Sequence, residues 1–181
     1  MPASLPVTFA ADSAAPWRIA RIRPLVGEPL PGAARLGVHE GPPTPDPSWA
    51  WHLSGVTSHL RYTGVGERGT LATRQPVLGR PQATRAALIP IRKSEAWWDL
   101  AQDERRMILA ESSQHIAIGL DYLPAIARRL VHCRDLGGPF DFLTWFEFSP
   151  EHEAAFDELL ARLRATEEWR FVTRECELRL A

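Results

Sequence analysis

The sequence has little of what marks an exported, membrane-embedded or nucleic-acid-binding protein. Its 21 basic and 22 acidic side chains give a formal net charge of −1, so charge offers no reason to expect a nucleic acid or an anionic membrane as partner. The N-terminus contains neither a basic segment ahead of an apolar core nor a long apolar run, so neither export nor membrane insertion is indicated. We therefore expect a cytoplasmic protein.

Cysteine is scarce, and internal repeats are lacking. Cys133 and Cys176 are the two cysteines of the chain, and in a cytoplasmic protein such a pair is more often free and buried than joined. No cysteine-based metal site is recognisable, and no repeat or heptad pattern points to a solenoid or a coiled coil. The length of 181 residues suffices for one or two small domains with a normal core.

The apolar pattern predicts a mixed α and β fold. Alternating apolar residues favour strands within residues 7–26, 48–62, 83–93, 140–148 and 170–180. Helical spacing and capping residues favour helices after Ser94, over 101–115 and over 149–169. Glycine and proline favour an extended loop over 27–47, and Pro90 suggests an edge strand or a bulge. The order of elements suits a ferredoxin-like antiparallel sheet covered on one side by helices.

Residues 111–135 place one histidine, His115, and one arginine, Arg128, in an otherwise apolar run. Between them stand Gly119, typical of helix ends, and Pro124, typical of helix starts. We therefore predict that the two side chains lie on separate helical segments that face one another, with space for a flat cofactor between them. Without further context, a lone histidine on an apolar helix face is more often a core residue than a ligand.

Several separated motifs resemble those of the chlorite dismutase family of haem proteins, and they occur in the family's order. They are ATRAALIPIRKSEAWWDL (83–100), the long segment 121–169 that begins DYLPAIARRL, and the ending ECELRLA. Together these motifs cover most of residues 50–181. The chain is most similar to the short, dimeric branch of the family, so the resemblance implies a homodimer.

The same resemblance implies an α+β fold in which two ferredoxin-like halves form one barrel-like antiparallel sheet with helices outside. The first half, together with the proline- and glycine-rich linker, corresponds to residues 1–80 and is truncated. The second half, residues 81–181, is the one that holds haem b.

Three residues match the proximal side of the family's haem site. His115 matches the iron ligand, and Glu168 matches the carboxylate that holds the other ring nitrogen of that histidine. Such a partner fixes the tautomer of the ring and adjusts how strongly it donates to iron. Lys93 matches a lysine near this network or near a haem propionate. Taken alone, Glu168 and Lys93 would be interpreted as solvated surface charges.

On the distal side, Arg128 matches an arginine whose permanent charge and planar donors suit a small oxyanion such as chlorite. The resemblance implies that haem takes an oxygen atom from chlorite, leaving a ferryl species and hypochlorite that recombine to chloride and dioxygen. Gln75, Ile89 and Phe146 match positions that line the distal side or the haem edge. Trp97 matches a tryptophan beside the haem on the proximal side.

Other functions remain open on the sequence. A coproheme decarboxylase-like enzyme resembles this chain around the histidine, but those proteins are longer and carry glutamine where Arg128 stands. A haem-binding sensor or carrier of the same fold would bind the cofactor without consuming chlorite, and a ferredoxin-like dimerising module would bind no cofactor. Haem binding and oxygen release from chlorite separate these classes.

Overall fold

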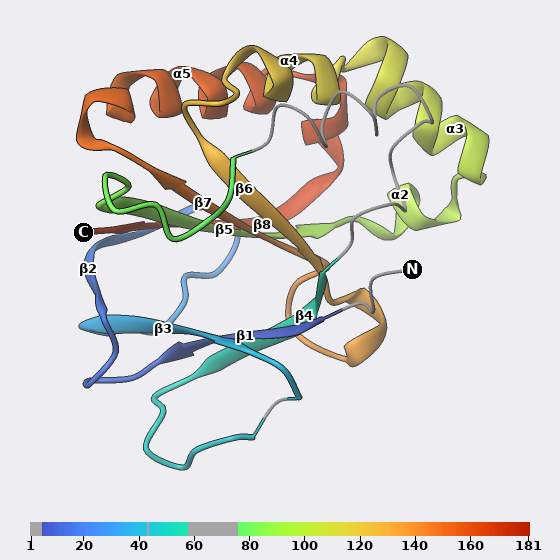
Figure 1. Cartoon of the computed structure of the whole chain (residues 1–181). Helices are drawn as coiled ribbons and strands as arrows, with labels where there is room; N and C mark the ends of the chain where they lie inside the picture. The colour runs from blue at the N-terminus through green and yellow to red at the C-terminus, as the bar shows by residue number, and fades with distance from the viewer. Residues whose placement is uncertain (1–4, 43, 58–75) are drawn as a thin grey trace.

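The computed structural model describes residues 5–42, 44–57 and 76–181, and within these ranges eight antiparallel strands close into a barrel (Figure 1). The order around the barrel is β1-β3-β2-β8-β5-β7-β6-β4. The strands are β1 Pro6–Ala11, β2 Trp17–Val26, β3 Arg35–Glu40, β4 His52–Thr57, β5 Arg85–Lys93, β6 Ala127–His132, β7 Phe142–Phe148 and β8 Val172–Leu180.

Two seams join the N-terminal strands to the C-terminal strands. β2 pairs with β8 along most of its length, whereas β4 meets β6 through two pairs, Val56 with His132 and Thr57 with Val131. All neighbouring strands run antiparallel. The predicted barrel-like antiparallel sheet with helices outside is therefore confirmed.

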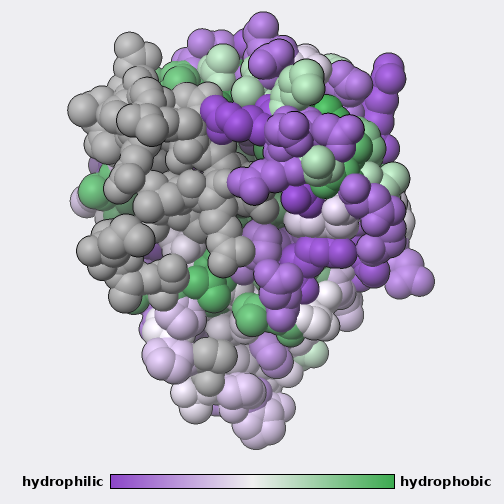
Figure 2. All heavy atoms as spheres, turned by 90° about the vertical axis from the view of Figure 1, so that its right-hand side faces the viewer, coloured by the Kyte–Doolittle hydropathy of each residue, from purple (hydrophilic) through white to green (hydrophobic). Residues whose placement is uncertain are grey.

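The helices lie over the side of the barrel formed by β5, β6, β7 and β8 (Figure 1). They are α2 Glu95–Asp99, α3 Gln102–Met107, α4 His115–Asp121 and α5 Glu153–Arg164, with a π-helical turn η1 Ile108–Ser112 and short 3-10 turns η2 Arg134–Leu136, η3 Pro150–His152 and η4 Glu167–Phe171. None of the helices in the described ranges is both long and apolar enough to cross a membrane. Figure 2 shows the side that carries α2 and α3, where hydrophilic residues dominate the described surface.

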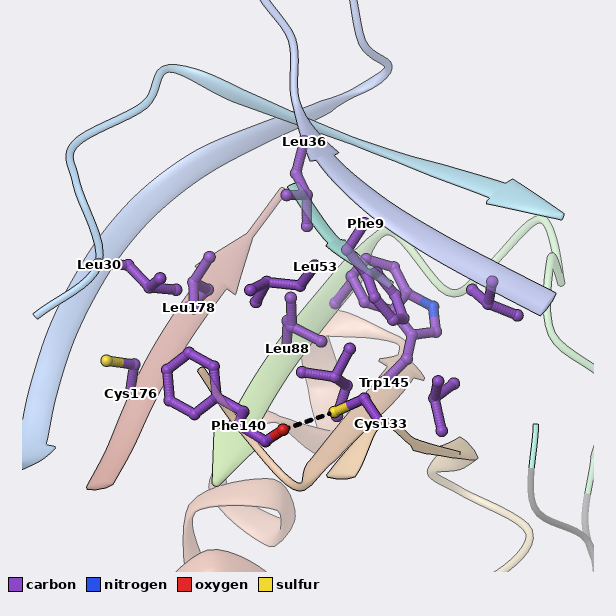
Figure 3. Packing of buried hydrophobic residues seen from close by; sticks show 14 of the residues in the cluster. Phe9, Leu30, Leu36, Leu53, Leu88, Cys133, Phe140, Trp145, Cys176 and Leu178 are labelled. Atoms are coloured by element: carbon purple, nitrogen blue, oxygen red, sulfur yellow. Dashed lines mark hydrogen bonds between the residues drawn. The ribbon is translucent and has the colours of Figure 1, made fainter. Parts of the chain in front are cut away.

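The barrel interior is an apolar core that contains both cysteines (Figure 3). Cys133 and Cys176 are free and buried, as predicted, and they lie on either side of Phe140. The Cys133 thiol donates a hydrogen bond to the Phe140 carbonyl oxygen at 3.0 Å. Burial raises the pKa of the Cys133 thiol to about 12, so this cysteine stays protonated and unreactive at neutral pH.

A second apolar layer lies between the outer face of the sheet and the helices. Along β5 and β7, Leu88 and Trp145 belong to the interior core, whereas their neighbours Ile89 and Phe146 belong to the outer layer, as the two-residue period of a strand requires. The helix predicted over 149–169 is confirmed in α5, whose apolar stripe covers this layer; its members are Phe156, Leu159, Leu160 and Leu163. The outer layer contains the candidate site.

One prediction about strands is wrong, and a second is wrong in one of its two alternatives. Residues 27–47 are not wholly loop, because β3 pairs with β1 and β2; those partners are distant in the sequence and leave no local signal. β5 is not an edge strand, since it lies between β7 and β8. Pro90 is tolerated because the pairing of β5 with β8 passes from Leu88 to Ile91 without a pair at Pro90, where a proline has no N–H to donate. The register shift follows at Arg92 and Lys93.

Two buried carboxylates on β8 fasten α5 to the sheet. Arg164 of α5 places its Nη2 atom 2.6 Å from Glu175 and 2.8 Å from Glu177. Arg179 and Arg21 each donate to Glu177 at 2.9 Å. Burial alone would raise the pKa of Glu177, but the hydrogen bonds from Arg164 and the charge and hydrogen bond of Arg179 outweigh it and lower the pKa to about 2.

The ion cluster around Glu177 predicts that the free energy of unfolding decreases at acidic pH. A carboxylate whose pKa falls from 4.5 to about 2 on folding contributes stability that is fully present above pH 4.5 and is lost as the pH falls toward 2. We expect Glu177→Gln to lower the free energy of unfolding at pH 7 by about 2–3 kcal/mol and to flatten its fall between pH 5 and pH 3. Urea unfolding across this pH range measures both effects, with exposed Glu158→Gln as the control. An unchanged pH dependence in Glu177→Gln would contradict the assignment.

Candidate functional site

An apolar pocket opens between the outer face of β5, β6 and β7 and the helices α4 and α5. Its empty space is about 1180 Å³, counted out to its open mouth. The walls are mostly apolar, and they include Ile89, Ile91, Phe146 and Leu160. Among the described lining residues, the imidazole of His115, the guanidinium of Arg128 and the carboxylate of Glu168 also reach the pocket. A concave, mainly apolar cavity with a few converging polar groups is the usual form of a cofactor or ligand site.

His115 is placed by a break in the helix that was predicted over residues 101–115. The helical turns α3 and η1 end at Ser112, and Gln114 has a left-handed backbone with φ of 50°. That conformation costs a non-glycine residue about 1–2 kcal/mol, and such strain is concentrated at functional sites. His115 is consequently the first residue of α4 and not the last residue of the preceding helix.

The structure brings the predicted proximal residues together. The Nδ1 atom of His115 lies 2.7 Å from one carboxylate oxygen of Glu168, and the Nζ atom of Lys93 donates to the other at 2.7 Å. The side chains of Lys93 and Glu168 are 1% and 5% exposed, so neither is the solvated surface charge that its sequence context alone suggests. The chain thus forms a buried line of lysine, glutamate and histidine that ends in the pocket.

The electrostatics of this line keep the carboxylate ionised. Burial alone would raise the pKa of Glu168, but the charges and hydrogen bonds of His115 and Lys93 lower it to about 2. Burial lowers the pKa of Lys93, while the charge and hydrogen bond of Glu168 oppose that fall. An ionised acceptor at Nδ1 holds the ring proton there, so the Nε2 lone pair is left to bind a metal.

Two residues that were not predicted from the sequence, Ser113 and Trp169, contact Glu168 and His115. The backbone N–H of Glu168 donates to the Ser113 hydroxyl at 2.9 Å. The ring of Trp169 lies nearly parallel to that of His115, at 17° and 6.5 Å between centroids, and its Nε1 donates to buried Glu175 at 2.8 Å. The available signal was the position of Trp169 directly after Glu168, but no local pattern indicates the contact with His115.

Arg128 lies on a strand and not on a helix, which corrects the prediction that two helical segments face one another. It belongs to β6 and pairs with Phe146 of β7. Gly119 is not a helix end, since it lies inside α4; a Cβ atom built there would meet the Arg128 guanidinium at 3.4–3.9 Å. At these distances a Cβ atom would make ordinary van der Waals contact, so the Arg128 guanidinium lies against α4 one helical turn from His115.

The pocket surrounds the Arg128 side chain, and burial lowers its pKa, although an arginine stays charged at any working pH. The neighbouring Arg129 forms an ion pair with Glu40 of β3. Successive residues of a strand point to opposite faces, so Arg128 reaches the pocket and Arg129 lies on the other face of β6.

The remaining predicted site residues lie as follows. Ile89, Phe146 and Trp97 line the pocket, whereas Gln75 lies outside the described residues. Trp97 is 1% exposed, and its ring lies 4.2 Å from the Lys93 ammonium. Within the described part of the chain, the Trp97 Nε1 is buried and has no hydrogen-bond partner, so this pocket wall carries a donor that a ligand's acceptor group would satisfy.

The fold and the site together define a class: a barrel of ferredoxin-like halves that holds, beneath its outer helices, a pocket with a carboxylate-anchored histidine and a half-buried arginine. Comparison with known proteins gives the family. The family model described as chlorite dismutase matches residues 49–180. The dimeric chlorite dismutase from Nitrobacter winogradskyi is 52% identical, with a TM-score of 0.89 over 97% of this chain and 99% of that one. The protein belongs to the chlorite dismutase family.

More distant structures agree on the fold. A mutant chlorite dismutase from Candidatus Nitrospira defluvii is 18% identical, with a TM-score of 0.66 over 98% of this chain and 91% of that one. The chlorite dismutase of the same organism in complex with imidazole is also 18% identical, with a TM-score of 0.63 over 99% and 92% of the two chains. At this identity the likeness concerns the arrangement of the backbone.

Proposed function

We propose that this protein binds haem b in the pocket beneath α4 and α5 and uses it to convert chlorite to chloride and dioxygen, as a cytoplasmic homodimer. The observation that carries the proposal is the meeting of two groups at one apolar pocket. His115, anchored by Glu168 at 2.7 Å, offers a metal-binding nitrogen, and Arg128 offers a fixed positive charge beside it. The dimeric state of the Nitrobacter protein supports the homodimer.

The residues present fit a haem. A neutral histidine whose second nitrogen is held by a carboxylate is a common axial ligand of haem iron. The apolar walls of the pocket suit a porphyrin ring. The unpartnered Nε1 of Trp97 is a donor suited to a haem carboxylate. These features would suit a large planar group that carries a metal at its centre and carboxylates at its periphery.

When bound, the haem would supply the iron centre at which a chlorine–oxygen bond of chlorite breaks and an oxygen–oxygen bond forms. Arg128 binds the chlorite anion and orients it through planar, charged donors. The apolar walls would strengthen that attraction and would hinder the escape of a small anion from the site. A single donor of this kind contributes a factor of about 10² to 10³ to the rate. We assign no general base, because the overall reaction transfers no proton.

A titration of the purified protein with haemin, followed by addition of chlorite in an oxygen electrode, tests this proposal. We expect a saturable Soret band and prompt oxygen release. A Soret band without oxygen release would indicate a haem carrier or sensor, and the lack of a saturable Soret band would refute every haem-based function. Free haemin at the same concentration is the control for oxygen release without the protein.

A further inference from the structure

Arg80, in the segment before β5, forms hydrogen bonds with the bend before β6. The Arg80 guanidinium donates from Nη1 to the Pro124 carbonyl at 3.3 Å and from Nη2 to the Ala125 carbonyl at 3.1 Å. The backbone N–H of the adjacent Gly79 donates to a carboxylate oxygen of Glu147 at 2.5 Å. Residues 79 and 80 therefore connect β7 with the chain that runs from α4 to β6.

Glu147 is a fixed point in this arrangement. Glu147 is 7% exposed, and the second oxygen of its carboxylate accepts a hydrogen bond from the Trp145 Nε1 at 2.8 Å. Trp145 packs in turn against Phe9 and Trp17 in the barrel core, with ring centroids 5.6 Å and 5.7 Å apart. Because the carboxylate is held from the core side, the Gly79 backbone is held where it meets Glu147.

The hydrogen bonds of Gly79 and Arg80 restrain the part of the chain that determines where Arg128 lies. Pro124 and Ala125 precede β6, and Ala127 and Arg128 are its first residues. Ala127 pairs with Glu147, the residue that holds Gly79, and Arg128 pairs with Phe146. Arg80 thus secures the entry to β6 from one side, while Glu147 and its strand secure it from the other.

The start of β6 is held both by strand pairing and by side-chain contacts. Residues 127–130 pair with β7, and the bend before them accepts the hydrogen bonds of Arg80. A two-pronged guanidinium contact to consecutive carbonyls restrains both their position and their orientation.

We propose that Arg80 is a positioning residue that fixes the entry to β6 and thereby the place of the Arg128 guanidinium in the pocket. The inference rests on the proposed function of Arg128 in chlorite conversion. Arg80 itself is not among the residues that line the pocket, so its effect on the reaction is transmitted through the bend. A displacement of about 1 Å in a charged donor is enough to slow a reaction by one to two orders of magnitude.

The test compares Arg80→Gln with Arg85→Gln. Arg85 lies five residues further along the same segment, donates to the Thr84 carbonyl at 3.4 Å and makes a long ion pair with Glu153 on the surface. We expect Arg80→Gln to bind haemin normally and to reduce kcat/KM for chlorite about tenfold, and Arg85→Gln to keep the parental value. Arg80→Lys, which retains the charge with a single donor point, should recover part of the loss. Azide binding, followed by the Soret shift, provides a measure of pocket geometry independent of turnover.

A double-mutant cycle separates positioning from general damage. In an Arg128→Ala background, Arg80→Gln should cause little or no further loss, because the residue through which it acts is gone. A tenfold loss that persists in that background would overturn the inference, and so would an Arg80→Gln variant with parental kcat/KM and azide affinity. If Arg80→Gln does not fold, Arg80→Lys and Glu147→Gln carry the same cycle. Unchanged turnover in Arg128→Ala alone would instead refute the proposed function of Arg128.

Discussion

Replacing His115 with alanine is expected to abolish tight haemin binding while leaving the fold intact. The side chain is 25% exposed and sits at the first position of a short helix, so its removal opens little core. Its loss removes the nitrogen proposed to bind iron and leaves Glu168 with its Lys93 partner. Replacing a group that merely orients a metal ligand costs about 10–100-fold in affinity, so losing the ligand itself should cost at least that much. Haemin titration by Soret absorbance measures the change.

Two further variants serve as a control and as an intermediate case for this prediction. His152→Ala is the matched control, since His152 lies at the surface in the turn before α5 and contacts Glu151; it should bind haemin as the parent does. Glu168→Gln keeps a hydrogen-bond acceptor but not the charge, so we expect an intermediate loss of about 10–100-fold. A His115→Ala variant with the parental Soret band and affinity would remove His115 from the metal site.

Replacing Arg128 with alanine is expected to leave haemin binding intact and to reduce kcat/KM for chlorite by about 10²–10³, the effect of removing one strong donor from a dry site. The guanidinium is the positive group proposed to hold the anion, and the apolar walls of the pocket offer little else to attract it. Arg128→Lys keeps the charge but not the planar donors, so we expect it to recover only part of the rate. Initial rates of oxygen release against chlorite concentration give both kcat and KM.

The adjacent arginine provides a closely matched control for this prediction. Arg129→Ala removes the same number of atoms from the next residue of β6, on the face that pairs with Glu40. It should keep the parental kcat/KM, with at most a small loss of stability. If Arg128→Ala retained the parental rate and lifetime during turnover, Arg128 would have no part in the reaction, and the proposed function would lose its anion-binding group.

The sequence predicted well those elements whose pattern is local. The helix α5 has a capping region, an acidic first turn and an apolar stripe within one segment, and its stripe is buried as expected. β7 alternates cleanly, with Phe146 toward the pocket and Trp145 toward the barrel core. None of the local contexts of His115, Glu168 and Lys93 indicates a buried charge. Their convergence could therefore be anticipated only from the order of the motifs along the whole chain.

The elements that the sequence did not predict depend on distant contacts. β3 forms because β1 and β2 supply partners for a segment with no strong strand signal of its own. The segment from Ala127 to His132 has no period that distinguishes helix from strand, and pairing with β7 decides in favour of a strand. Gly119 looked like a helix end, whereas it lies inside α4 and faces the Arg128 guanidinium. The contact of Arg80 with the bend at Pro124 and Ala125 spans more than forty residues.

The central claim is that one pocket converts a single chlorite ion to chloride and dioxygen without releasing an intermediate. The most direct test supplies the haem-loaded protein with chlorite labelled with ¹⁸O at both oxygens, in unlabelled water, and analyses the gas by mass spectrometry. We predict dioxygen that carries both labels, with one chloride formed for each dioxygen. Dioxygen that incorporates oxygen from water, or chlorite loss with little dioxygen and free hypochlorite in solution, would contradict the proposal.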